Sequence, residues 1–473
     1  MKRVFARWRW SRAALAGLSL ALLAPTAAPA DDPAVLELDV TDPESQGSEE
    51  KPDPAEQARL DALATPTHRQ TAVIKIGGED DPVTVATFCL TRDGALLAAC
   101  PRAKLEGEEE KSGAQLRLLS PKGELLKTVA IDFTPQAINV DAAGNIYVGG
   151  AQSLAKYSAD GKRLVKNDAP NVVDMDAMME KMRKQVRRQY ETAREQMQRR
   201  LEGMQELLAT QEERLAGLKA EEAEAGEQAP RTKGDEPDAD EEERATEADR
   251  RKLQIEVLTG QIQHLKAQLP MYERHLEHVR SRAEPTDEQI RQMIRYRTQV
   301  AGIACGPAGI YVACSATEGY GYEIWLLKSD LTDPKKIAGD QRGCCGQFDI
   351  QAHGDTVYAA ANCRFSVVGF NGEGEETICF GKRGGGDIEG FGSCCNPMNI
   401  RFAPNGDCYT AEASVGAIKR FNKDGKFQGV VAQAELVPGC KHVAIDVTPD
   451  GERVYMLDIT RSQIYVFERG PGD

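Results

Sequence analysis

Short apolar stretches separated by glycine turns run from residue 71 to residue 467, with one interruption. In six places the same unit recurs: a strand that alternates apolar and polar positions, a tight turn with a glycine, and a second apolar strand. The six segments are TFCLTRDGALLAAC (87–100), AINVDAAGNIYVGG (137–150), GIACGPAGIYVAC (302–314), QFDIQAHGDTVYAAANC (347–363), NIRFAPNGDCYTAEA (399–413) and AIDVTPDGERVYMLD (444–458). A third short strand follows each segment. Such alternation predicts antiparallel hairpins, and six copies of the unit predict an all-β propeller with six blades.

The run TAVIKI (71–76) precedes the first repeat and is a strand without a partner. The sixth repeat lacks a strand, because no fourth strand follows its third one, which ends at Phe467. An open sheet edge promotes pairing with other chains. We therefore expect residues 71–76 to form the outer strand of the sixth blade and to close the ring.

Two repeats are the most regular, PQAINVDAAGNIYVGGAQSLAKYSADGKRLVK and CNPMNIRFAPNGDCYTAEASVGAIKRFNKDGKFQGVV. In both, a proline or polar residue precedes an apolar-x-apolar strand, and a glycine turn, an aromatic strand and a strand ending in D-G-K follow. These units resemble the repeats of the NHL family of β-propellers. The resemblance implies propeller segments over residues 71–171 and 299–473. Because NHL propellers include both binding modules and enzymes, the resemblance implies a fold and not one activity.

Residues 172–298 interrupt the repeats with a heptad pattern. Apolar residues spaced by three and four predict two long helices in an antiparallel coiled-coil hairpin around the polar segment 221–243. Pro270 is expected to kink or interrupt the second helix, and TDEQ (286–289) predicts a capping box that starts a third, short helix. Two roles stay open for the hairpin, a spacer within the chain or an arm that docks on a partner or a second copy. The heptad positions are Met197, Leu201, Met204, Leu208, Gln211, Leu215 and Leu218, then Ile255, Leu258, Ile262, Leu265, Leu269, Tyr272, Leu276 and Val279.

Residues 1–30 have the features of a secretory signal: basic residues, the apolar run AALAGLSLALLA and the motif APA ending at Ala30. Residues 31–70 are acidic and aromatic-poor, which predicts a disordered tether. No later apolar run reaches the roughly 20 residues of a membrane span. The protein is therefore expected to be periplasmic or secreted, with cleavage after Ala30. Its net charge of −15 argues against nucleic acid and anionic membranes as partners.

Most of the 12 cysteines gather at one face of the predicted propeller, where the connections between blades meet. An even number in an oxidising compartment favours disulfides, for example Cys345 with Cys363 or Cys379 with Cys394. A soft metal ion held by thiolates is a second hypothesis, and thiol redox chemistry is a third, although C-x-x-C is absent. The disulfide candidates are Cys344, Cys345, Cys363, Cys379, Cys394 and Cys395, and the metal candidates are Cys394, Cys395, Cys440 and His442.

Polar residues stand on the innermost strands of three consecutive blades, as Asp349, Arg401 and Asp446, with Asn399 close by. An arginine between two carboxylates is most often a satisfied charge network. It can also bind a small ligand that carries a carboxylate and a cation, because a guanidinium forms two parallel hydrogen bonds with a carboxylate. The same carboxylates and Asn399 are ligand types of a lactonase-like metal site, without a motif that supports one.

The sequence thus predicts an extracytoplasmic propeller that acts as a protein-binding or scaffolding module, with the hairpin as a docking arm and as a route to self-association. It favours a role other than an enzyme, because G-x-S-x-G and H-E-x-x-H are absent and the propeller has too few histidines for the channel metal of amidating lyases that share NHL repeats. No cofactor is predicted. The alternatives are a metal-dependent lyase-like or lactonase-like enzyme at the channel, and a thiolate metal-binding or redox protein.

Overall fold

The computed structural model of the chain describes ten stretches of the sequence. They are residues 54–78, 81–101, 113–150, 152–227, 239–281, 284–344, 346–384, 387–393, 395–437 and 442–470. The predicted secretory signal and the tether up to residue 53 lie outside them.

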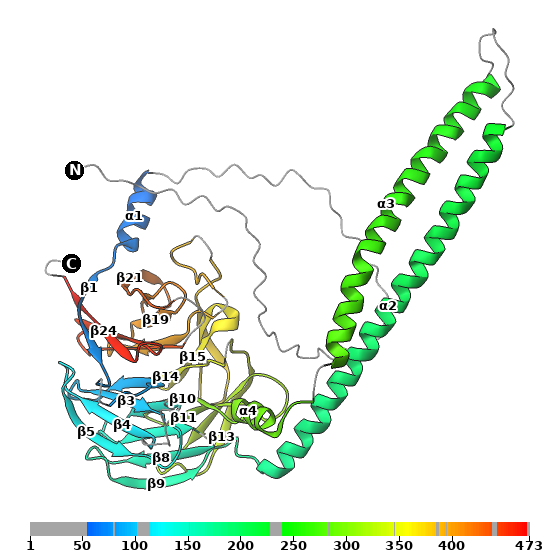
Figure 1. The fold of residues 1–473 in the computed structure, drawn as a ribbon. Coiled ribbons are helices and arrows are strands. Elements are labelled where there is room, and N and C mark those ends of the chain that lie inside the picture. The colour runs from blue at the N-terminus through cyan, green and yellow to red at the C-terminus, as the bar shows by residue number, and fades with distance from the viewer. Residues whose placement is uncertain are drawn as a thin grey trace. The chain divides into compact units, whose positions relative to one another are not determined.

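The described strands form six four-stranded antiparallel sheets, which are the blades of a propeller (Figure 1). Blades one and two are β2 (Thr87–Leu90), β3 (Leu96–Cys100), β4 (Gln115–Leu119) and β5 (Leu125–Ala130), then β6 (Ala137–Val140), β7 (Ile146–Gly150), β8 (Ser153–Tyr157) and β9 (Arg163–Asp168). Blades three and four are β10 (Val300–Gly306), β11 (Gly309–Ser315), β12 (Tyr322–Leu327) and β13 (Lys335–Gln341), then β14 (Ile350–His353), β15 (Thr356–Ala361), β16 (Ser366–Phe370) and β17 (Glu376–Phe380), with a 3-10 turn η1 (Asn362–Arg364). Blades five and six are β18 (Asn399–Phe402), β19 (Cys408–Glu412), β20 (Ala417–Phe421) and β21 (Phe427–Gln433), then β22 (Val443–Val447), β23 (Arg453–Asp458), β24 (Gln463–Arg469) and β1 (His68–Lys75).

Strand β1 completes the sixth blade, as the sequence predicted. It pairs with β24 in antiparallel register from His68 opposite Arg469 to Lys75 opposite Gln463. The strand begins before Thr71, and helix α1 (Pro54–Ala64) precedes it. Residues 54–70 therefore hold regular structure where a disordered tether was predicted. The backbone N–H of Thr67 donates to the carbonyl oxygen of Val430 at 3.3 Å, which ties this segment to blade five.

The innermost strands of neighbouring blades contact one another in a closed ring, in the order β2, β6, β10, β14, β18, β22 and back to β2. Apolar side chains from facing sheets fill the space between blades. Between blades six and one, Phe88 and Leu96 pack with Tyr455 and Leu457, and none of these four is more than 1% exposed. Complete burial of a side chain such as Phe88 contributes roughly 1.5–3 kcal/mol. Blade-to-blade packing thus stabilises the ring.

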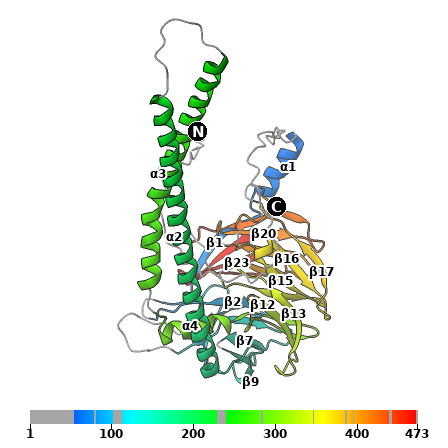
Figure 2. The same ribbon diagram turned by 90° about the vertical axis from the view of Figure 1, so that its right-hand side faces the viewer.

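Residues between blades two and three form a helical hairpin. Helices α2 (Met175–Glu227) and α3 (Ala239–Ser281) run antiparallel side by side (Figures 1 and 2). The predicted heptad seam is buried or half-buried, with Leu201, Leu258, Ile262 and Leu276 the most enclosed. Helix α3 continues through Pro270, so of the two predicted effects, a kink or an interruption, the interruption does not occur. Packing of the seam on both sides of this residue keeps the helix in place although a proline cannot donate the usual hydrogen bond.

The base of the hairpin is fixed to blade three. Asn171 donates from Nδ2 to the carbonyl oxygens of Gln299 at 3.0 Å and Ser315 at 3.3 Å, so the two ends of the insertion meet. Helix α4 (Asp287–Arg297) starts with the predicted capping box between Thr286 and Gln289. The apolar residues that join α2 to α4 are Met178, Met179, Met182, Ile290 and Ile294.

Replacing Gln211 with leucine is expected to stabilise the hairpin by about 1–2 kcal/mol. Gln211 occupies a seam position, and its side-chain oxygen is buried without a hydrogen-bond partner among the described residues. The measurement is urea unfolding followed by circular dichroism at the helical minimum. Gln205→Leu, on the exposed face of the same helix, is the control and should change stability by less than about 0.5 kcal/mol. A destabilised Gln211→Leu protein would show that this oxygen is hydrated.

Candidate functional site

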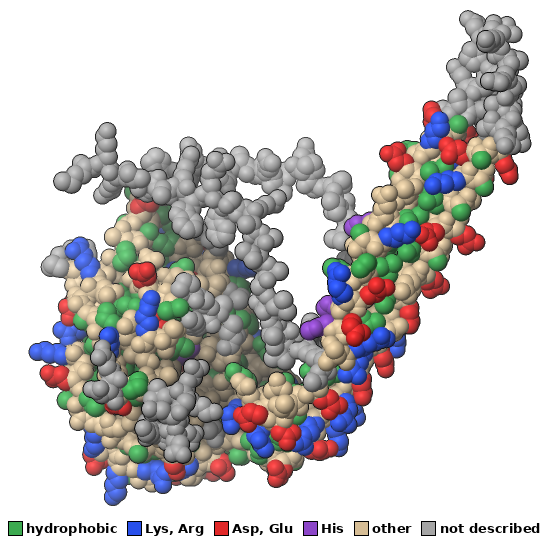
Figure 3. Space-filling view, in the orientation of Figure 1, with side chains coloured by type: hydrophobic (Ala, Val, Ile, Leu, Met, Phe, Trp, Pro, Cys, Tyr) green, Lys and Arg blue, Asp and Glu red, His purple; other side chains and the backbone are tan. Residues whose placement is uncertain are grey.

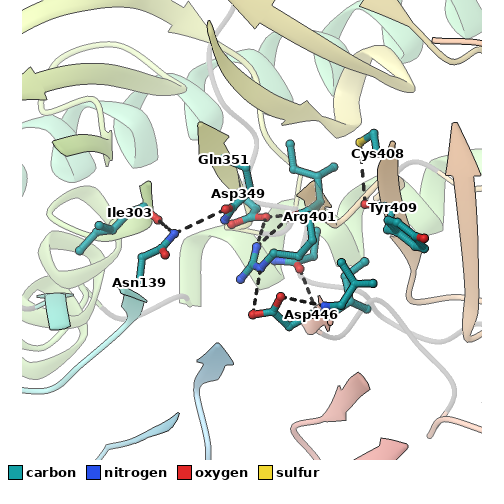
Figure 4. A network of polar contacts seen from close by, with 12 residues as sticks. Asn139, Ile303, Asp349, Gln351, Arg401, Cys408, Tyr409 and Asp446 are labelled. Carbon is teal, nitrogen blue, oxygen red and sulfur yellow. Dashed lines mark hydrogen bonds and ion pairs between the residues drawn. The ribbon is translucent and has the colours of Figure 1, made fainter. Parts of the chain in front are cut away.

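The predicted charged group lies between the innermost strands, at the centre of the ring that is called the channel below (Figure 4). Nη1 of Arg401 lies 3.1 Å from Oδ2 of Asp349, and its Nε lies 3.8 Å from Oδ2 of Asp446. Arg401 and Asp349 are buried and Asp446 is half-buried, with side chains 8%, 11% and 14% exposed. Nη1 also donates to the carbonyl oxygen of Ile400 at 2.7 Å. The structure therefore brings the three residues together as the sequence predicted, with the guanidinium between two carboxylates.

The same polar side chains also bond to the backbone of the next blade. Oδ2 of Asp349 accepts from the N–H of Ile400 at 2.9 Å, and Oδ1 of Asn399 accepts from that of Ile445 at 2.9 Å. Oδ2 of Asp446 accepts from the N–H of Leu90 at 2.7 Å, which links blade six to blade one.

Asn139 plays a similar part between blades two and three. Its Nδ2 donates to the carbonyl oxygen of Ile303 at 2.9 Å. At four junctions between neighbouring blades, a side chain on an innermost strand, or directly before it in the case of Asp349, therefore bonds to the next innermost strand. The candidate ligand-binding residues Asp349, Asn399 and Asp446 are three of these four links.

Burial governs the protonation of the channel groups. It raises the pKa of the Asp349 and Asp446 carboxyls above the ordinary value, and the charge of Arg401 opposes this rise. Burial also raises the pKa of the Cys89 thiol far above its usual range, and Asp446 adds to the effect. A thiol held in the protonated form is a poor nucleophile. Arg401 and the two buried carboxylates therefore form a charge-compensated network.

His442 lies beside this network and is half-buried. Burial and, to a smaller extent, the positive charge of Arg401 lower its pKa to about 4. Its ring is therefore neutral at pH 7, and the buried Nδ1 has no hydrogen-bond partner in the described part of the chain. Of the other metal candidates, Cys395 is described and buried, whereas Cys394 and Cys440 lie outside the described residues. Within the described stretches, no three His, Cys, Asp or Glu residues are placed to hold a metal ion.

The four disulfide candidates that the structure describes separate into two groups. Cys344 and Cys395, from the connections that lead into blades four and five, have their sulfur atoms 3.4 Å apart. Cys363 and Cys379 are exposed, and Sγ of Cys379 accepts from Nη2 of Arg364 at 3.9 Å. Cys345 lies outside the described residues, as Cys394 does. The example pairs Cys345–Cys363 and Cys379–Cys394 stay predictions.

A buried ion pair in blade five was missed by the sequence reasoning. Nζ of Lys419 lies 2.5 Å from Oε1 of Glu412, and both side chains are at most 7% exposed. A signal was present, because Glu412 ends a second strand at a position where Gly150 and Ala361 stand in other blades. A carboxylate at such a buried strand end requires a cation nearby.

Comparisons with known proteins find similar proteins, but they do not assign the chain to a family. No protein-family model matches the chain, so the resemblance to NHL repeats is not confirmed. The chain is 28% identical to the adipocyte plasma membrane-associated protein of Salmo salar over 138 residues, which are 27% of this chain and 31% of that protein. The match thus spans less than a third of that relative's length.

Two of the similar solved structures are enzymes by their names. A streptogramin B lyase has a TM-score of 0.41 and 10% identity, and the match covers 84% of this chain and 98% of that one. A gluconolactonase from Xanthomonas campestris has a TM-score of 0.40 and 8% identity, over 86% of this chain and 96% of that one. The propeller fold of this chain rests on its own sheet topology, and we take no activity from these two similarities.

Proposed function

We propose that the protein is an extracytoplasmic binding module in which the propeller is a rigid scaffold and the hairpin of α2 and α3 contacts a protein partner. The observation that carries this proposal is the apolar surface of the hairpin outside its seam. Leu253, Val257 and Met271 of α3 are 62%, 52% and 53% exposed, and Leu207 of α2 is 47% exposed. Figure 3 shows hydrophobic side chains among the charged ones along the hairpin.

The exposed apolar residues of α3 have a helical spacing of their own. Leu253, Val257 and Met271 follow steps of four and then twice seven residues, so they share one face of the helix. This face is distinct from the seam, which contains Leu258 and Ile262. A helix with two apolar stripes buries one against its hairpin partner and has the second available for another protein. We name Leu253, Val257 and Met271 the outer stripe.

The polar groups of the channel also favour binding through the hairpin, because they already bond to one another. Asp349, Arg401 and Asp446 bond to one another and to neighbouring backbone, so a ligand that entered would have to replace these contacts. Breaking a buried ion pair costs several kcal/mol. A binding function through the hairpin needs no such rearrangement.

The extracytoplasmic part of the proposal rests on the N-terminal sequence. Basic residues, an apolar run and a cleavage motif within residues 1–30 are typical of secretion. Among the described residues, no helix is long and apolar enough to cross a membrane.

Changing the outer stripe to serine, as Leu253→Ser, Val257→Ser and Met271→Ser together, is expected to lower partner binding more than tenfold while the hairpin stays helical. Loss of three buried apolar side chains removes several kcal/mol of interface energy. The measurement is quantitative affinity capture from the extracytoplasmic fraction of the producing cells. The matched control is Glu256→Ser, Gln263→Ser and Glu273→Ser, which alters exposed polar positions of the same helix. Equal capture by the two triple variants would contradict the proposal.

A further inference from the structure

Two cysteines from different blades touch at the junction of blades four and five. Cys344 precedes β14 and Cys395 precedes β18, and their sulfur atoms lie 3.4 Å apart although 51 residues separate them in sequence. Cys395 is 1% exposed, and Cys344 packs against the same apolar cluster between blades five and six. The two thiols therefore meet inside the protein and not on a surface loop.

A buried asparagine holds the backbone around Cys344. Asn362 is fully buried, and its Oδ1 accepts from the N–H of Cys344 at 2.7 Å. Its Nδ2 donates to the carbonyl oxygen of Gln347 at 3.1 Å. The N–H of Gln347 in turn donates to the carbonyl oxygen of Cys344 at 3.1 Å. The turn that carries Cys344 is thus fixed on both sides.

A second buried asparagine holds the turn that carries Cys395. Asn396 is fully buried, and its Nδ2 donates to Oε2 of Glu412 at 3.2 Å and to Oγ of Ser414 at 3.0 Å. Its Oδ1 accepts from the N–H of Ala413 at 3.2 Å.

The buried ion pair of Glu412 and Lys419 in blade five also holds the segment that leads into this turn. Oε2 of Glu412 also accepts from the N–H of Gly392 at 3.1 Å, and Nζ of Lys419 donates to the carbonyl oxygen of Gly390 at 2.6 Å. Burying an ion pair does not by itself stabilise a protein. Here the pair positions the chain. Lys419 and Glu412 hold Gly390 and Gly392 before Cys395, and Glu412 holds Asn396 after it.

We infer that Cys344 and Cys395 form a disulfide that joins blade four to blade five. Both turns are fixed by fully buried polar groups, so the thiols meet with little loss of freedom, and closing the bond requires the sulfur atoms to approach by about 1.4 Å. This inference selects one pair among the six cysteines that the sequence left open. It does not depend on partner binding by the hairpin, but it rests on the extracytoplasmic location in the proposed function, because an oxidising compartment is where such bonds form.

The bond forms by thiol–disulfide exchange with a disulfide donor, either a small-molecule disulfide or an oxidoreductase of the extracytoplasmic compartment. One cysteine thiolate attacks a donor sulfur, which breaks the donor S–S bond and releases one donor thiolate. The second cysteine thiolate then attacks the mixed disulfide and releases the other donor thiolate. The two cysteine sulfurs are oxidised, the two donor sulfurs are reduced, and the two protons of the cysteines end on the two donor thiols.

The test is a disulfide map of the secreted full chain in which the adjacent cysteines are removed as Cys345→Ser and Cys394→Ser. Digestion without reductant by trypsin and chymotrypsin separates Cys344 from Cys363, because chymotrypsin cleaves after Phe348 and Tyr358. We expect a cross-linked peptide pair that contains Cys344 and Cys395. Adding Cys344→Ser should abolish it, whereas the matched control Cys363→Ser should retain it.

Two results would overturn the inference. One is alkylation of both Cys344 and Cys395 in denatured protein that has never been reduced, and the other is a bond from either residue to a different cysteine. If the background variant is not secreted, electron-transfer fragmentation of wild-type peptides distinguishes Cys344 from Cys345 and Cys394 from Cys395, with the same two outcomes deciding. In the folded protein, reduction should lower the melting temperature by roughly 5 °C.

Discussion

Shortening the hairpin at the level of Gln198 and Arg280 is expected to abolish partner binding and leave the propeller folded. Nη2 of Arg280 donates to Oε1 of Gln198 at 2.7 Å, so a short Gly/Ser turn can replace residues 199–279. The base of the hairpin keeps its apolar contacts with α4, such as Met182 with Ile290 and Ile294. Partner binding should fall by at least about tenfold, and the melting temperature of the propeller should change by less than about 2 °C.

A smaller deletion is the control for this experiment. Replacing only residues 228–238 with a short Gly/Ser turn shortens the connection between α2 and α3 and leaves both helices and the outer stripe in place. This variant should bind as the full chain does. Binding that survives the long deletion would show that the partner contacts the blades, and loss of binding in both variants would assign the contact to the connection.

Arg401→Ala is expected to lower the free energy of unfolding by about 3–5 kcal/mol. The substitution leaves the carboxylates of Asp349 and Asp446 buried without their cation, at a point where both also bond to the next blade. The measurement is equilibrium urea unfolding followed by tryptophan fluorescence and circular dichroism together.

An exposed ion pair of the same protein is the matched control. Arg453 lies 2.7 Å from Glu468, with side chains 45% and 40% exposed, and Arg453→Ala should cost less than about 1 kcal/mol. Combining Arg401→Met with Asp349→Asn and Asp446→Asn should recover most of the loss, because the amide oxygens still accept from Ile400 and Leu90. An Arg401→Ala protein as stable as Arg453→Ala would mean that water already solvates the channel carboxylates.

The repeating parts of the fold could be predicted because local patterns specify them. The six hairpins, the heptad seam and the capping box at Thr286 each depend on residues a few positions apart. Closure by β1 was predicted from one missing and one surplus strand. Tertiary packing keeps α3 continuous at Pro270, where an interruption was one of the two predicted effects. The local rules misled in residues 54–64 and 68–70, where α1 and the start of β1 stand in the predicted tether.

The site could be predicted only in part. The alignment of repeats brought Asp349, Arg401 and Asp446 together correctly, because equivalent positions of a propeller face one channel. It left open whether they bind a ligand, since their backbone partners are far away in sequence, as Leu90 is from Asp446. The pairing of Cys344 with Cys395 had no sequence signal for the same reason, because it depends on the path of two connections that Asn362 and Asn396 hold.

The most direct test of the binding proposal is site-specific photo-cross-linking in the producing cells. A photoreactive amino acid replaces Leu253 in the outer stripe in one variant, and Gln351, which bonds with Asn139 in the channel, in a second. The proposal predicts a cross-linked product with another protein, or with a second copy of this chain, from position 253 and none from position 351. Cross-linking from position 351 alone would contradict the proposal and place the contact at the channel.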